Sequence, residues 1–517
     1  MITKINNNWM QEVRKQIIHF SLFTFTFFLV SCSSPSVPTQ FTDIKKEPPI
    51  YPDYTNVTIP VNIAPLTFEF NKPCEEIVAQ FTVGDHQLVC GGQAVQPSMD
   101  EWRELVGKAV GSQKDISVEV YVKVQEKWWH YDPFHITVSP DSIDPYLSYR
   151  LISPSYVAYE ELTLNQRCLE NYDEQVMVNN MLCSQEIKGQ CVNCHNYQQY
   201  NPRRMQFHAR QSHGGTVIAY DGKLSKINMR NDSILSAGVY PAWHPWLPLI
   251  VYSTNKTSQS FHTRNLNKIE VFDAVSDLIA YDVAKNEVTN IENEETEFEV
   301  FPVWAPDGKT LYYCSAHFEF RDTVSHDVEV VRRYKEVKYN IYKKSFNPDT
   351  YAFGPRELVF QADSIGKSAT LPRVSPDGRF LVFTVGHYGV FHIWHREADL
   401  CLLDLTSGEV RTMDEINSRE TESYHAWSSN GRWLVFSSRR DDGSYTRPFF
   451  AHIDANGKGS KPFELPQADP DYHRQFMKCY NIPEFMRGPV EVSPQEFASV
   501  LKASDGEPVK YVPQLTK

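Results

Sequence analysis

Two cysteines and a histidine near the middle of the chain have the spacing of a covalent haem site. The segment reads Gln190-Cys191-Val-Asn-Cys194-His195. In c-type haem attachment, two thiols separated by two residues add to the porphyrin vinyl groups, and the histidine that follows ligates the iron. On a short helical turn all three side chains reach the cofactor. We therefore predict one covalent haem c, held by Cys191 and Cys194, with His195 as the proximal iron ligand.

Two other uses of a CxxC pair are open but weaker. A structural zinc site needs four ligands, and the sequence has no second CxxC. A thioredoxin-like dithiol sits between a strand and a helix, and the flanks of Cys191 and Cys194 do not have that pattern.

The sixth iron ligand has several candidates. Pro202 favours a helix start there, and on that helix Met205 and His208 would share one face. We favour His208, then Met205, then His213; an open site, or a remote ligand among His473, Met477 and Met486, remains an alternative. A histidine would give a low-potential haem suited to electron transfer, and a methionine would raise the potential.

The N-terminus has the pattern of a bacterial lipoprotein signal. Basic residues precede an apolar run from Ile17 to Val30, which ends in Leu29-Val30-Ser31-Cys32. A small residue before a cysteine at the cleavage point predicts that residues 1–31 are removed and that Cys32 is acylated. An ordinary signal with an incidental cysteine is the alternative. Because bacterial haem c is attached outside the cytoplasm, both motifs indicate the cell envelope.

Charge and composition exclude some partners. The net charge of −13 becomes −15 without residues 1–31, which hold three basic residues and one acidic residue. This balance argues against nucleic acid and against adhesion to anionic headgroups, so the lipid would be the membrane anchor. No second apolar run reaches the ~18 residues of a membrane span. The composition, with 41% hydrophobic residues, is that of a packed globular chain, and its length predicts two or three domains.

The chain divides by pattern into successive regions. We expect a mainly β protein with a tether at 32–57, a β-sandwich with one helix at 58–148, a short helical cytochrome c-like haem segment at 149–213, a β-propeller at 214–468 and a C-terminal strap at 469–517. Cys74 with Cys90, and Cys168 with Cys183, could each be bridged or free. Cys314 and Cys401 lie in apolar strand-like runs and should be buried thiols.

A repeated hairpin predicts the propeller. Its copies are Pro241-Ala-Trp243, Pro302-Val-Trp304, Pro372-Arg-Val374 and His425-Ala-Trp427, the last three followed by Pro-Asp-Gly or Asn-Gly and all by a β-rich run. These turn residues tolerate positive φ and make tight hairpins. The spacings of 61, 70 and 53 residues exceed the ~40–45 of a minimal blade, so the blade count stays open, with six favoured.

The hairpins resemble those of TolB-like propellers. With the lipoprotein signal and CxxCH, the arrangement is similar to envelope lipoproteins of the cytochrome c/TolB-like type found in Bacteroidetes-like bacteria. The resemblance implies a haem-bearing propeller that docks a protein partner. In such bacteria acidic residues after the lipidated cysteine direct export to the surface. Residues 33–37 have none, so the periplasmic face of the outer membrane is favoured.

Three functions are compatible with these features. The first is electron transfer by a lipid-anchored mono-haem cytochrome whose propeller docks a redox partner. The second is a haem-dependent redox enzyme or sensor with an open iron site. The third is a protein- or glycan-binding propeller with a structural haem. The sequence contains no serine nucleophile elbow, HExxH helix or Walker loop, so whether the chain is an enzyme stays undecided.

Overall fold

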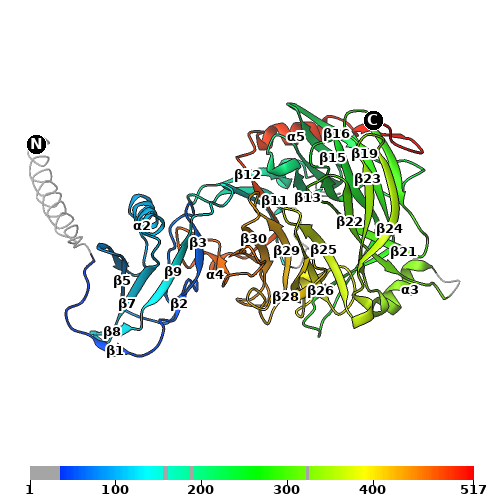
Figure 1. Cartoon of the computed structure of the whole chain (residues 1–517). Coiled ribbons are helices and arrows are strands. Elements are labelled where there is room, and N and C mark those ends of the chain that lie inside the picture. The colour runs from blue at the N-terminus through cyan, green and yellow to red at the C-terminus, as the bar shows by residue number, and fades with distance from the viewer. Residues whose placement is uncertain (1–34, 155–160, 185–189, 322–324) are drawn as a thin grey trace, which may run out of the picture.

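The computed structural model describes residues 35–154, 161–184, 190–321 and 325–517. The predicted signal and Cys32 lie outside these residues. The described chain is mainly β and has two parts (Figure 1). An N-terminal sheet with one helix lies beside a larger, propeller-like arrangement of blades.

The N-terminal part contains one main sheet, in the order β1-β8-β7-β5-β6, with β9 pairing β7 and β3. This differs from the expected two-sheet sandwich. Its elements are β1 Thr42–Ile44, β2 Ile50–Tyr51, β3 Thr58–Pro60, β4 Glu69–Phe70, β5 Glu76–Val83, β6 His86–Gly92, α2 Met99–Ser112, β7 Ile116–Val124, β8 Lys127–Tyr131 and β9 Phe134–Ser139.

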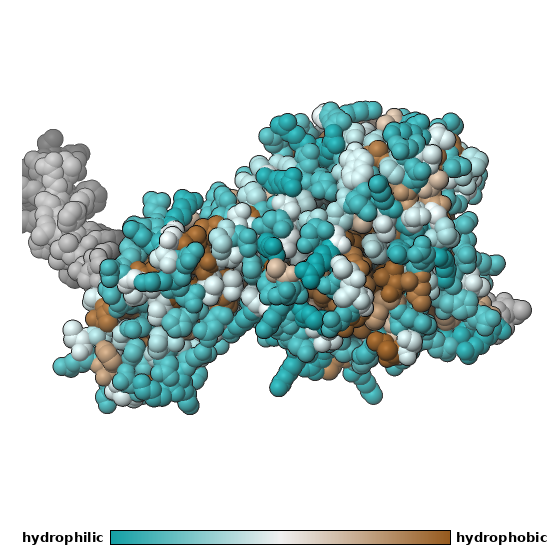
Figure 2. Space-filling model, in the orientation of Figure 1, coloured by the Kyte–Doolittle hydropathy of each residue, from teal (hydrophilic) through white to brown (hydrophobic). Residues whose placement is uncertain are grey.

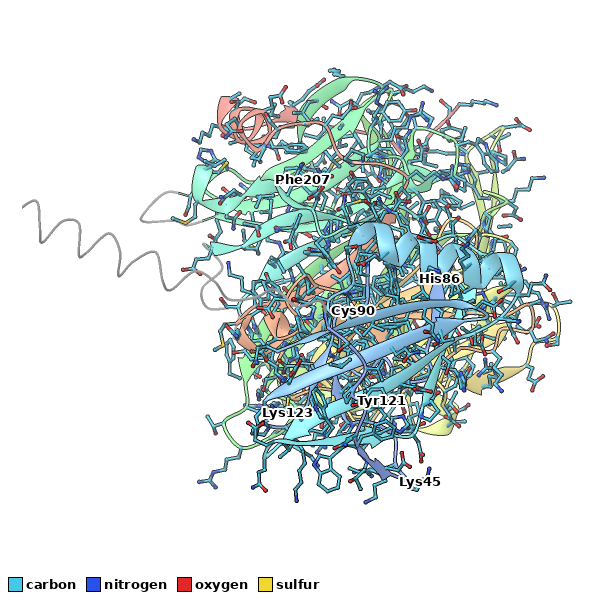
Figure 3. The ribbon with its side chains drawn as sticks, turned by 90° about the vertical axis from the view of Figure 1, so that its left-hand side faces the viewer. Lys45, His86, Cys90, Tyr121, Lys123 and Phe207 are labelled. Carbon is cyan, nitrogen blue, oxygen red and sulfur yellow. The ribbon has the colours of Figure 1, made fainter. Side chains whose placement is uncertain are left out.

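Helix α2 is the one helix predicted for this region, and a capping box fixes its start. The Ser98 side chain accepts a hydrogen bond from the Glu101 backbone N–H, and the Glu101 carboxylate accepts one from the Ser98 backbone N–H. Trp102 and Leu105 lie on its buried face. Figure 3 shows α2 beside the strands that carry His86 and Tyr121.

The larger part consists, within the described residues, of six antiparallel units of four strands. Four units are separate sheets, and two belong to one sheet joined by a single parallel pair. The strands are β10 Tyr146–Ile152, β11 Thr163–Cys168, β12 Glu174–Asn179 and β33 Cys479–Met486; β13 Gln190–Tyr197, β14 Met205–Gln211, β15 Gly215–Tyr220 and β16 Lys223–Asn228; β17 Val239–Trp243, β18 Leu249–Phe261, β19 Ile269–Asp282 and β20 Glu287–Glu292; β21 Glu297–Trp304, β22 Thr310–His317, β23 Asn340–Asn347 and β24 Ala352–Phe360; β25 Ser368–Val374, β26 Phe380–Gly386, β27 Asp399–Asp404 and β28 Val410–Thr412; β29 Glu422–Trp427, β30 Trp433–Ser438, β31 Arg447–His452 and β32 Phe463–Glu464.

Chain segments far apart in sequence close the arrangement. The first strand of one unit, β33, comes from the end of the chain and pairs with β10, from before the CxxCH segment. The residues expected to be a C-terminal strap therefore include a propeller strand. Two short strands, β34 Glu507–Pro508 and β35 Lys510–Tyr511, add to the outer strands β16 and β20.

The helical cytochrome c-like segment expected at 149–213 is not present in the described residues. Strands β10 to β14 occupy this region, with only the 3-10 turns η2 Asn180–Leu182 and η3 Gln198–Tyr200 between them. The turn after Tyr197 includes Pro202, which precedes β14 rather than opening a helix. Tertiary pairing overrides the local helical pattern here.

The remaining helices lie outside the four-stranded units. They are α3 His326–Arg333, η4 Tyr334–Glu336, η5 Asp363–Ile365, η6 His392–Trp394, α4 Tyr472–Gln475 and α5 Pro494–Ala503. No helix among the described residues has the length and hydropathy of a membrane span. The face shown in Figure 2 is mostly hydrophilic, with apolar groups gathered over parts of the propeller.

The two parts of the chain share a core. Phe68 and Trp102 of the N-terminal part belong to the same buried cluster as Trp433 of β30 and Phe450 of β31. Polar contacts cross the same junction: Trp433 Nε1 donates to the carbonyl of Asp141 at 3.0 Å. Of the cysteines, Cys314 and Cys401 are buried, as predicted, and all nine described cysteines are free.

Candidate functional site

The first strand of each unit has a bulge at the same place. Two residues of this strand lie opposite one residue of the next strand. The first bulge residue has a φ near +50° in every unit: Cys194, Tyr240, Phe301, Leu371, Tyr424 and Ile482. The residue opposite is a fully buried aromatic each time: Phe207, Tyr252, Tyr313, Phe383, Phe436 and Tyr149. Because the bulge recurs in all six units, it is a regular feature of the blade and not local strain.

The register of these strand pairs shows which position of the repeated strand the CxxCH segment occupies. His195 occupies the second bulge position, which other units fill with Pro241, Pro302, Pro372, His425 and Pro483. The residue after next is aromatic or aliphatic in all six: Tyr197, Trp243, Trp304, Val374, Trp427 and Phe485. Cys194 and His195 therefore belong to the same repeat as the four hairpins recognised in the sequence.

The geometry of this segment does not fit a covalent haem. Cys191, Cys194 and His195 lie on an extended, bulged strand and not on a helical turn. Cys194 is 3% and His195 1% exposed. The cavity beside them is about 30 Å³, enough for about two waters by the usual ~10–15 Å³ each. Haem binding stays a prediction from the motif, and nothing in the arrangement of these residues supports it.

His195 is a buried, neutral imidazole. Burial, with the Arg150 guanidinium nearby, lowers the pKa of His195 to about 3, although the backbone of Ser148 and Ile482 partly opposes this. Neither ring nitrogen makes a hydrogen bond of good geometry. Burial likewise raises the pKa of the Cys194 thiol. Among the described residues, no group of three or more His, Cys, Asp and Glu side chains is arranged to hold a metal ion.

The predicted sixth ligands are dispersed. Met205 and His208 lie three apart on strand β14, where alternation places them on opposite faces. His208 Nδ1 lies 3.1 Å from the Thr216 hydroxyl, and His213 follows that strand. Of the remote candidates, His473 Nδ1 contacts Glu464 Oε1 at 2.5 Å, whereas Met477 is exposed and Met486 is buried.

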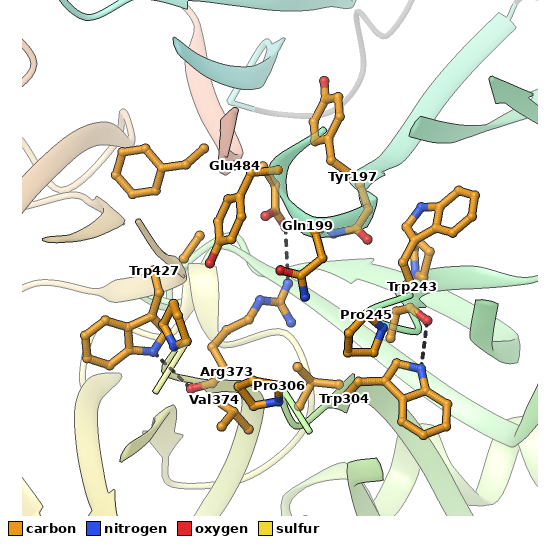
Figure 4. Close-up of a pocket in the computed structure, with 18 of the residues that line it drawn as sticks. Tyr197, Gln199, Trp243, Pro245, Trp304, Pro306, Arg373, Val374, Trp427 and Glu484 are labelled. Carbon is orange, nitrogen blue, oxygen red and sulfur yellow. Dashed lines mark hydrogen bonds and ion pairs between the residues drawn. The ribbon is translucent and has the colours of Figure 1, made fainter. Parts of the chain in front are cut away.

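A funnel opens at the end of the bulged strands, next to the small cavity beside His195. It has a volume of about 170 Å³ and is lined by the ends of the first strands and by hairpin prolines (Figure 4). Asn196, Pro241, Pro302, Arg373 and Glu484 line both the funnel and the small cavity. The two spaces are therefore adjacent, and we call them together the axial path.

The residue after the bulge gives this path its chemistry. In the six units it is Asn196, Ala242, Val303, Arg373, Ala426 and Glu484. The guanidinium of Arg373 lies 3.5 Å from Glu484 Oε1, and Asn196 Nδ2 donates to the same oxygen at 3.3 Å. Figure 4 shows Arg373 and Glu484 facing each other in the funnel. Burial raises the pKa of Glu484, and Arg373 opposes this shift.

The tryptophans of the funnel have a structural role. Trp304 Nε1 donates to the carbonyl of Ala242 at 3.2 Å, and Trp427 Nε1 donates to that of Arg373 at 3.1 Å. Each bond joins one unit to the first strand of the preceding unit. Because Trp243, Trp304 and Trp427 are at most 6% exposed, they are not a stacking platform for a ligand.

The chain was compared with known proteins. No family model matches, and no curated protein matches. A prolyl endopeptidase structure is 13% identical over 63% of this chain and 42% of its own, with a TM-score of 0.32. Prolyl oligopeptidase B from Galerina marginata is 10% identical over 63% and 44%, with a TM-score of 0.35. An oligogalacturonate lyase in complex with manganese is 11% identical over 68% and 85%, with a TM-score of 0.27.

The chain thus spans less than half the length of the prolyl peptidases that it matches.

Proposed function

We propose that this protein is a lipid-anchored binding module of the cell envelope, whose propeller holds a small polar group in the axial funnel. The anchor would be the acylated Cys32, with the body on the periplasmic face of the outer membrane. The observation that carries the binding role is the set of side chains at one repeated position, where Arg373 and Glu484 meet.

The chain provides its own internal comparison for this position. Ala242, Val303 and Ala426 satisfy the blade geometry with small apolar side chains. A guanidinium, a carboxylate and an amide are therefore not required by the blade. Partly buried ion pairs contribute little to stability once their desolvation is counted. A role in recognition explains why Asn196, Arg373 and Glu484 face the axial path.

The same groups define the ligand's chemistry. A planar guanidinium recognises a carboxylate or carbonyl oxygen, and a carboxylate accepts hydrogen bonds from an ammonium or hydroxyl group. The funnel admits a group of about the size of an amino acid or a single sugar ring. We infer a ligand with a donor and an acceptor a few ångströms apart, which would separate the Arg373–Glu484 pair as it enters.

Saturation-transfer NMR with a panel of free amino acids, dipeptides and monosaccharides tests this proposal. We expect the full chain to bind at least one class, and Arg373→Ala and Glu484→Ala to lose that binding. Val303→Ala is the matched control, because it changes the residue after the bulge in a unit where that residue is apolar. Absence of binding across the panel, or unchanged binding by Arg373→Ala, would contradict the proposal.

Electron transfer through a haem c on Cys191, Cys194 and His195 is the competing proposal. Its support is the CxxCH spacing alone. An absorption spectrum and an intact mass of the purified protein separate the two, since covalent haem adds both a Soret band and the mass of the cofactor.

A further inference from the structure

A second hollow lies away from the funnel, where the β14–β15 hairpin meets the chain after β16. It has a volume of about 390 Å³. The residues that carry the argument are His208, Arg210, His213, Lys226, Arg230 and Asp505. Three of these, Arg210, Lys226 and Arg230, are basic residues, and one, Asp505, is acidic. In a chain with a net charge of −13, such a basic hollow is a local reversal of charge.

The guanidinium groups of the two arginines have no partner among the described residues. Neither the Arg210 nor the Arg230 guanidinium makes a hydrogen bond or ion pair with any residue in the described ranges of the chain. Both side chains are exposed at the rim of the hollow. Each guanidinium therefore keeps its five donors available for a ligand.

Lys226 adds a buried amino group to the wall; burial lowers its pKa, and nearby Asp505 opposes this shift. Its side chain is 6% exposed, and Nζ donates to the carbonyls of Leu501 at 2.9 Å and Ser504 at 2.7 Å. These carbonyls end helix α5, so the structural role of Lys226 is to cap that helix. A Cβ on Gly215 would come within 2.7 Å of Lys226 Cε, which explains the glycine beside it.

The histidines contribute hydrogen bonding rather than charge. Burial lowers the pKa of His208 to about 3 and also lowers that of His213. Both imidazoles are therefore neutral at pH 7, and each has one ring N–H. His208 Nδ1 is held at the Thr216 hydroxyl.

We propose that this hollow binds a phosphate-type oxyanion, either free or as the substituent of a larger molecule. Arg210 and Arg230 would clamp the oxyanion from the rim, since guanidinium groups match the oxygens of phosphate in geometry and charge. Lys226 favours the negative charge from the wall. The site is separate from the funnel and does not depend on the ligand proposed there.

Calorimetric titration with inorganic phosphate, at constant ionic strength in chloride, tests the site. We expect saturable binding by the full chain and at least about tenfold weaker binding by Arg210→Gln/Arg230→Gln, because charge-assisted hydrogen bonds are lost. Arg264→Gln/Arg419→Gln removes two exposed arginines elsewhere and should bind as the wild type does. Absence of phosphate binding, or equal loss in both double variants, would overturn the proposal.

A second titration, with a soluble short-chain phosphatidic acid, identifies the source of the oxyanion. Tighter binding than inorganic phosphate, lost in Arg210→Gln/Arg230→Gln, assigns a lipid headgroup; similar affinity assigns a free phosphate. Lipid binding that both double variants retain would overturn the site for that ligand. Arg373→Ala should leave both titrations unchanged, so a failure of the funnel proposal is distinguishable from a failure here.

Discussion

Trp427 Nε1 donates a hydrogen bond at 3.1 Å to the carbonyl of Arg373. This bond holds the backbone that carries the funnel's guanidinium, because the two residues are on first strands of neighbouring units. Trp304 makes the equivalent bond to Ala242, which belongs to a unit where the residue after the bulge is apolar. The same bond thus supports a polar position in one unit and an apolar position in another.

Trp427→Phe keeps most of the buried ring but removes its N–H donor. We expect the free energy of unfolding to fall by ~1–3 kcal/mol, because the buried Arg373 carbonyl loses a partner. Chemical denaturation measures this change. Trp304→Phe should cost a similar amount but leave ligand binding in the funnel unaltered, whereas Trp427→Phe should also weaken that binding. Equal effects of the two variants on binding would contradict this division.

Four of the six first strands could be recognised from the sequence, and two could not. The four carry Pro or His, then Trp or Val, before a short hairpin whose turn residues are mostly Pro-Asp-Gly or Asn-Gly. The strand of Tyr197 lacks that turn, since its hairpin passes through Gln199 and Tyr200 at positive φ. The strand of Phe485 has no hairpin partner after it, because its partner β10 precedes it by more than 300 residues.

The CxxCH segment could not be interpreted from local spacing alone. Two residues between cysteines suit a helical turn, and they equally suit a bulged strand in which Cys194 takes the position of Tyr240 or Phe301. Only the register with five other strands distinguishes these conformations. The same register brings the side chains of Asn196, Arg373 and Glu484 into contact, and no short sequence motif predicts this contact.

Expression with a c-type cytochrome maturation system tests the haem prediction. From the strand geometry we expect a polypeptide mass without haem and no Soret band in the spectrum. Cys191→Ala should then change stability little, because Cys191 is only partly buried. A wild-type mass increased by one haem, and lost in Cys191→Ala/Cys194→Ala, would instead establish the cytochrome.

Cys32→Ala tests the anchor. If Cys32 is acylated, the wild type should fractionate with membranes and the variant should be released into the soluble fraction. Protease treatment of intact cells should leave the wild type uncut if it faces the periplasm. Membrane association that persists in Cys32→Ala would contradict lipid anchoring.

Buried neutral histidines predict a dependence of stability on pH. His425 donates from Nε2 to the carbonyl of Val382 at 2.9 Å, and burial lowers its pKa to about 3. In the unfolded chain this histidine is protonated below about pH 6.5, whereas in the fold it stays neutral. Its contribution to stability is therefore complete above pH 6.5 and is lost as the pH falls below that value. This contribution falls by ~2 kcal/mol between pH 7 and 5. His425→Pro should lose correspondingly less stability over that range, as measured by chemical denaturation at both pH values.

His195→Pro is the sharpest test of the repeated strand. Proline fills this position in four of the six units, so the blade needs no backbone N–H there. We expect unchanged stability, or a gain of up to ~1 kcal/mol from the stiffer unfolded chain. His208→Pro is the matched control, because His208 pairs with both Asn193 and Thr216 and its replacement should cost ~3 kcal/mol or more. Since a haem ligand cannot be proline, a folded and stable His195→Pro protein would assign His195 to the blade; a loss as large as that of His208→Pro would refute its equivalence with Pro241.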